Sequence, residues 1–61
     1  MTATNEQKLK CAERELRFRQ RVYPHLVERG KMTRQESDRE LELMQAIADD
    51  YRILAQAELL I

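Results

Sequence analysis

The chain has 61 residues, and its 11 Lys and Arg balance its 11 Asp and Glu, so its formal net charge is zero. This length suits one small domain near the lower limit of a self-sufficient core, and one Cys with one His excludes a disulfide framework and a four-ligand zinc site. No apolar run approaches 18 residues and no signal-peptide core begins the chain, so we expect a cytoplasmic protein without cofactor or metal.

The first predicted element is a helix over residues 5–22, with Thr4 or Asn5 as its N-cap. Arg19 interrupts its apolar stripe, where its guanidinium can stay in water or pair with an acid of an opposing helix. The apolar residues of the stripe recur at helical spacings: Leu9, Ala12, Leu16 and Tyr23.

Residues 24–33 predict a break and then a reversal of the chain. Pro24 lacks a backbone donor and clashes with the preceding turn, so we expect a kink there and a short separate segment over 24–29. Gly30, the only glycine, is typical of a left-handed helix C-terminus, and Thr33 with Glu36 forms a capping-box pattern. The turn is therefore expected at 30–33.

The second predicted helix runs over residues 34–60 without Gly or Pro. The two helices then form an all-α antiparallel hairpin in one domain, 1–61. We expect the core to consist of apolar residues from both helices: Leu9, Leu16 and Tyr23 against Leu41, Met44, Ile47, Tyr51 and Leu54.

Further apolar residues lie off this stripe and indicate self-association. On the first helix they lie about 120° away from the core stripe, and others end the chain. Two hairpins joined as a homodimeric four-helix bundle would bury them. The expected self-association face consists of Cys11, Phe18, Val22, Leu59 and Ile61.

Charge is unevenly distributed: residues 1–31 carry eight basic and four acidic side chains, and residues 32–61 carry three and seven. Four cations at spacings of four and three form a ridge opposite the first helix's core stripe: Lys10, Arg14, Arg17 and Arg21. This basic ridge could bind an RNA or DNA backbone. The alternative, which zero net charge favours, is a solvated face on a protein-binding module.

No residue pattern predicts catalysis. His25 has no recognisable nucleophile beside it, and Cys11 has no resolving cysteine. A hairpin of this size is also expected to lack a pocket of several hundred cubic ångströms. We therefore expect a non-catalytic protein with no catalytic, cofactor-binding or metal-binding residues.

The pattern Val22-Tyr23-Pro24, then 30–33 (Gly-Lys-Met-Thr), then Asp49-Asp50-Tyr51 resembles a group of short uncharacterised proteins encoded by phages and prophages of Gram-negative bacteria. About two thirds of the chain takes part in the resemblance. It implies a phage accessory protein made in the host cytoplasm, and it supplies no activity or ligand. From the zero net charge and the surplus apolar faces, we expect the protein to bind an unidentified phage or host protein.

Overall fold

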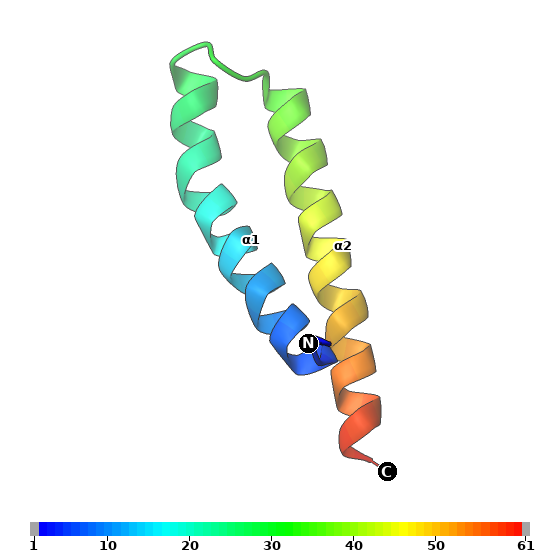
Figure 1. Cartoon of the computed structure of the whole chain (residues 1–61). Coiled ribbons are helices and arrows are strands. Elements are labelled where there is room, and N and C mark those ends of the chain that lie inside the picture. The colour runs from blue at the N-terminus through cyan, green and yellow to red at the C-terminus, as the bar shows by residue number, and fades with distance from the viewer. Residues whose placement is uncertain (1, 61) are drawn as a thin grey trace.

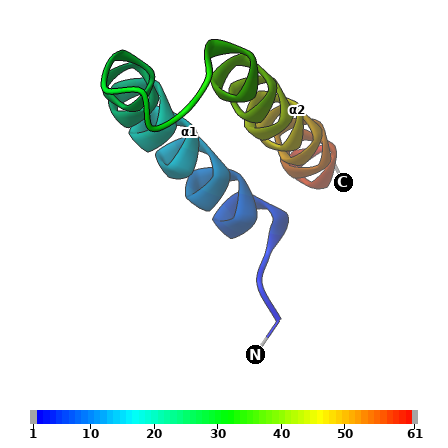
Figure 2. The same cartoon turned by 90° about the horizontal axis from the view of Figure 1, so that it is seen from above.

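A computed structural model describes residues 2–60 of the chain, which form two helices. Helix α1 spans Asn5–Glu28 and helix α2 spans Arg34–Leu59. The helices run antiparallel and lie side by side in two perpendicular views (Figures 1 and 2), within extents of 47 × 20 × 16 Å. The predicted all-α helical hairpin is confirmed.

Side-chain caps fix where both helices begin. The Thr4 hydroxyl accepts a hydrogen bond from the Gln7 amide at 3.1 Å, and the Gln7 side-chain oxygen accepts one from the Thr4 amide at 2.9 Å. Thr33 and Glu36 form the same reciprocal pair at 3.0 and 3.1 Å. Each box satisfies amides that have no partner within the helix, so the predicted starts at Thr4 and Thr33 are confirmed.

The end of α1 is a Schellman motif built on Gly30. The Lys31 amide donates to the Leu26 carbonyl at 2.8 Å, and the Gly30 amide donates to the Val27 carbonyl at 3.0 Å. Gly30 has φ +72°, which strains an L side chain even though a Cβ there would meet no atom within 4 Å. The predicted left-handed stop at Gly30 is confirmed.

The expected break at Pro24 is wrong, because α1 continues through Pro24 to Glu28 as one helix. The separate segment over 24–29 is therefore part of α1. Proline removes one donor from the ladder, and the residue four positions earlier, Gln20, is exposed, so water can satisfy its carbonyl. Beyond Pro24, half-buried Leu26 and Val27 anchor the last turn, which supports helical continuation.

Small residues line the contact between the helices. Ala12 and Leu16 of α1 pack with Met44 and Ala48 of α2, and Leu41 packs against this cluster. Ala48 is 0% exposed, and Ser37 and Ala55 are also buried. Short side chains along this line allow the two backbones to approach closely, and the core is correspondingly thin.

Two residues expected in the core lie outside it. Ile47 is 44% exposed and Leu54 is 47% exposed, while Leu16 and Met44 are buried as predicted. Leu9, Tyr23, Leu41 and Tyr51 are half-buried. Ala48 and Ala55, each one residue beyond an exposed neighbour, occupy the inner positions instead. The larger side chains are thereby turned towards one side of the hairpin.

Candidate protein-binding face

The exposed apolar side chains of α2 form a row along one side of the helix. Leu43, Ile47 and Leu54 are each between 44% and 49% exposed, and they are spaced four and seven residues apart. Ile47 and Leu54 line a shallow hollow together with Tyr51 and Asp50. Such spacing places all three apolar side chains on one helix face.

A matching row runs along α1. Cys11 and Phe18 are exposed, and Val22 is half-buried, at spacings of seven and four residues. Phe18, at 46% exposed, is the largest of them, and the Arg21 guanidinium lies 5.8 Å from its ring centroid. The structure therefore brings together three of the residues expected to mediate self-association.

Contacts between the helices place both rows on the same side of the hairpin. Lys8 lies one turn before Cys11, and its ammonium is 5.6 Å from the ring centroid of Tyr51, which borders the α2 row. Arg19 lies beside Phe18 and donates to the Glu40 carbonyl at 3.1 Å, one turn before Leu43. We call the combined surface the apolar face: Cys11, Phe18, Val22, Leu43, Ile47 and Leu54.

Arg19 bridges the two rows. Its guanidinium pairs with Glu15 at 3.0 Å and with the Glu40 carboxylate at 3.8 Å, and it lies 5.9 Å from the Tyr23 ring centroid. Pairing with an acid of the opposing helix is one of the two roles predicted for Arg19. Arg19 occupies the position at which an apolar residue would continue the core stripe of α1. Its side chain and its acidic partners cover the contact between the helices there.

The opposite side of the hairpin is polar. Arg52 of α2 pairs with Glu13 of α1 at 3.1 Å and with Asp49 at 2.8 Å. Hydrogen bonds from Arg52, first to Glu13 and then to Asp49, raise the pKa of its guanidinium. Gln45 also donates to Asp49 on this side, at 3.0 Å. The two exposed apolar rows thus lie on one broad side of the hairpin, and Arg52 with its acidic partners lies on the other.

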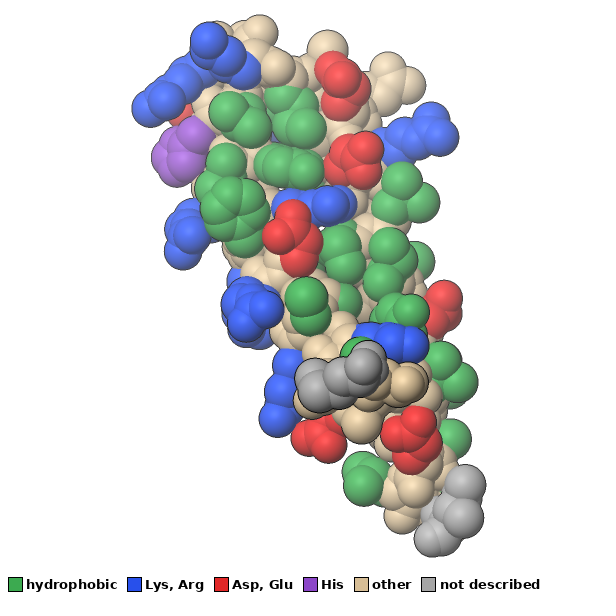
Figure 3. All heavy atoms as spheres, in the orientation of Figure 1, with side chains coloured by type: hydrophobic (Ala, Val, Ile, Leu, Met, Phe, Trp, Pro, Cys, Tyr) green, Lys and Arg blue, Asp and Glu red, His purple; other side chains and the backbone are tan. Residues whose placement is uncertain are grey.

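Figure 3 shows one broad side of the molecule, in the orientation of Figure 1. Hydrophobic side chains gather over α2 and over the loop end, and Lys and Arg follow the outer edge of α1. That edge carries the basic ridge, whose four residues are all exposed. Lys10 pairs with Glu6 at 3.4 Å, and Arg14 lies 3.9 Å from the Cys11 sulfur.

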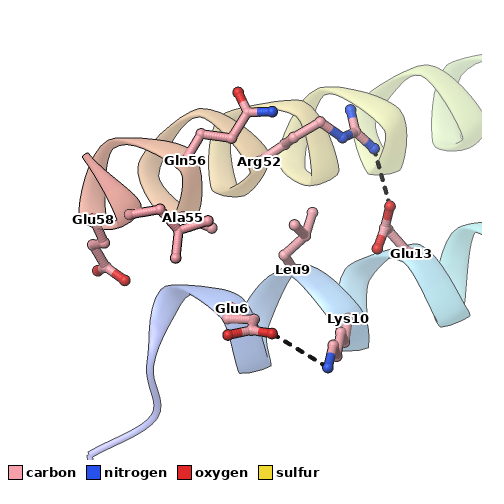
Figure 4. Close-up of a pocket in the computed structure, with 9 residues that line it drawn as sticks. Glu6, Leu9, Lys10, Glu13, Arg52, Ala55, Gln56 and Glu58 are labelled. Atoms are coloured by element: carbon pink, nitrogen blue, oxygen red, sulfur yellow. Dashed lines mark hydrogen bonds and ion pairs between the residues drawn. The ribbon is translucent and has the colours of Figure 1, made fainter.

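A groove of about 420 Å³ lies between the helices at the open end of the hairpin, so the expectation of no such pocket is wrong. Figure 4 shows Leu9 and Ala55 between the helices and the Glu13–Arg52 and Glu6–Lys10 pairs beside them. The space arises because the small Ala55 faces α1 there. No Ser, Cys, Thr, His or Tyr lines this groove.

One of the two remaining residues of the expected self-association face is not on the apolar face. Leu59 is 82% exposed and lines the groove, about 140° around α2 from Leu54. Ile61 lies outside the described residues. Sequence reasoning missed Leu43 and placed Ile47 and Leu54 in the core. Their spacing of four and seven residues was the signal that they share a face.

Comparison with known proteins gives no relative: no family model, no curated protein and no solved structure matches this chain. Among residues 2–60, neither helix is long and apolar enough to cross a membrane. The account of function therefore rests on the geometry of the apolar face.

Proposed function

We propose that this chain is a non-catalytic interaction module, a helical hairpin that binds a helix of another protein molecule through its apolar face. The observation that carries the proposal is that exposed apolar residues of both helices share one broad side, on which the Arg19 ion pairs lie between the two rows. The Arg52 ion pairs occupy the other side. Contiguous apolar surface bordered by polar residues is typical of protein-binding sites.

The shape of the face supports a helical occupant. Two rows, with Phe18 and Val22 on α1 and Ile47 and Leu54 on α2, run along the same side of the hairpin, and the α2 row lines a shallow hollow. An amphipathic helix lying along these rows buries side chains at spacings of three and four residues. The resemblance to short phage and prophage proteins adds the proposal of an accessory protein in the host cytoplasm.

Site-specific photo-crosslinking in cells tests this function. A photoreactive amino acid at Ile47 is expected to form protein adducts, because the partner covers that position. The matched control is Ile53, which is 65% exposed and lies about 240° further around α2. Protein adducts at position 47 together with their absence at position 53 support the proposal. Equal yields at both positions, or no adduct at position 47, would refute it.

The basic ridge favours a second candidate, binding to an RNA or DNA backbone. Lys10, Arg14, Arg17 and Arg21 are exposed along a single edge of α1. Glu6 already pairs with Lys10, and the seven acids of α2 offset the field of the ridge. This candidate ranks second, and a titration described in the Discussion separates it from the first.

A further inference from the structure

We infer that the occupant of the apolar face is a second copy of this chain, stacked so that α1 of each hairpin lies on α2 of the other. This inference rests on the proposed function, because it names the partner of the same face. The two copies form an antiparallel four-helix bundle whose loops lie at the same end.

The broad side that carries the apolar face is large enough for a stable dimer. The broad side of the hairpin measures 47 by 20 Å, a rectangle of about 940 Å², whereas a standard specific interface buries about 800 Å² on each partner. The hairpin alone has a thin core in which Leu16 and Met44 are the largest buried residues. Adding a second layer of helices supplies the apolar burial that such a small domain lacks.

Charge complementarity selects the second copy and its orientation. Basic side chains border the α1 row: Lys8 lies one turn before Cys11, with its ammonium 5.6 Å from the Tyr51 ring centroid, and the Arg21 guanidinium lies 5.8 Å from the Phe18 ring centroid. The α2 row is interleaved with acids at the same helical spacing, namely Glu36, Glu40 and Asp50. Stacking α1 on the other copy's α2 brings opposite charges together twice, once on each side of the two-fold axis.

The competing arrangement stacks α1 on α1 and α2 on α2. It brings the basic residues that border the two α1 rows against each other, and the two rows of acids against each other. Like charges facing each other across an interface are unfavourable, and this cost applies along the whole length of both helices. The unlike stacking is therefore the arrangement that the distribution of charge supports.

The register of the hairpin also matches apolar residues across this interface. Within one hairpin Arg19 lies level with Glu40, and Lys8 lies level with Tyr51. A two-fold axis along the bundle keeps these heights, so Phe18 comes level with Leu41 of the other α2, two residues from Leu43, and Cys11 comes level with Ala48, next to Ile47. Lys8 then comes level with Tyr51, next to Asp50.

Sedimentation equilibrium of the full chain tests the second copy. At high micromolar concentration the wild type is expected to show twice the chain mass of 7.3 kDa. Ile47→Glu should give a single-chain mass, because the substitution places a charge in the middle of the face. Ile53→Glu, the matched control outside the face, should remain dimeric. Circular dichroism of both variants establishes that they are helical.

Charge reversal tests the orientation at low salt. Lys8→Glu and Asp50→Arg should each raise the dimer Kd by about 2-fold to 30-fold, since two exposed ion pairs are reversed in each dimer. The double variant should return the Kd towards the wild-type value. In the like-on-like arrangement Lys8 faces the basic α1 of the other copy, so Lys8→Glu would remove repulsion and lower the Kd.

Two results overturn the inference. A wild type that sediments as a single chain excludes the second copy, and in that case crosslinks from position 47 to a protein of another mass would still support the proposed function. A dimer that Ile47→Glu leaves intact, or that Lys8→Glu strengthens, excludes the stacking of α1 on α2.

Discussion

Replacing the buried Ala48 with leucine should destabilise the hairpin more than the same replacement at an exposed alanine of α2. Ala48 is 0% exposed and lies at the contact between the helices, where it packs in the cluster with Leu16 and Met44. Three additional carbon atoms have no space there, so the helices must separate or the side chain must leave its rotamer. Overpacking of this kind costs about 1–3 kcal/mol.

That cost is large for this protein. Domains are stable by about 0.05–0.15 kcal/mol per residue, which gives about 3–9 kcal/mol for a chain of 61 residues. A loss of 1 kcal/mol lowers the melting temperature of so small a domain by about 4–8 °C. Ala48→Leu should therefore lower the midpoint by at least that amount.

Ala46 provides the matched control for this substitution. It is exposed and lies about 200° around α2 from Ala48. Alanine and leucine differ little in helix propensity, so Ala46→Leu should change stability by only a few tenths of a kcal/mol. Urea unfolding followed by far-UV circular dichroism compares the two variants at one protein concentration. Equal midpoints would refute close packing of the helices at Ala48.

Four further predictions test the core, the caps and the ridge. Leu16→Ala should cost about 2–5 kcal/mol in urea unfolding, because Leu16 is buried between the helices; an unchanged midpoint would contradict the core. Thr33→Ala should cost about 1 kcal/mol by removing the cap of α2, and Thr33→Ser should recover most of it. Hydrogen bonds from the Thr33 backbone and then its side chain lower the pKa of Glu36 below its ordinary value of 4.5. The stability from this carboxylate is thus complete above pH 4.5 and lost as the pH falls through the lower folded pKa, and Glu36→Gln, which can still accept the bond, should flatten that acid-side loss. Finally, duplex DNA and hairpin RNA should bind no tighter than about 10⁻⁴–10⁻⁶ M at physiological salt, with a log–log salt slope of about −3 to −4 on duplex DNA for four contacts; nanomolar binding that Arg14→Glu with Arg17→Glu abolishes would promote the nucleic-acid candidate.

The ends of the helices were predictable because their signals are local. A threonine three residues before a glutamate satisfies free amides by itself, and Gly30 supplies the positive φ that ends α1. The break at Pro24 was predicted wrongly because the sequence shows only the local costs of a proline, its steric clash and its missing amide donor. Packing of Leu26 and Val27 offsets these costs. That packing depends on the position of α2, which local sequence does not show.

The division of α2 between core and surface was not predictable for a different reason. Apolar residues at spacings of three and four cover a broad stripe, from Leu41 through Ile47 to Ala55, and a single neighbouring helix buries only part of it. Size suggests that Ile47 should be inside. The short side chain of Ala48 permits the closest approach of the helices instead. The apolar face is the part of the stripe that remains uncovered.

The most direct test of the account compares two isoleucine methyl groups in the full chain. Ile47 lies on the apolar face and Ile53 lies away from it, and both are exposed in the single hairpin. With selectively labelled isoleucines, a soluble paramagnetic agent reports the accessibility of each methyl group by NMR at low and high protein concentration. We expect the Ile47 methyl to become protected as concentration rises while the Ile53 methyl stays accessible. Equal accessibility of both methyl groups at every concentration would contradict the conclusion that a second copy covers the apolar face.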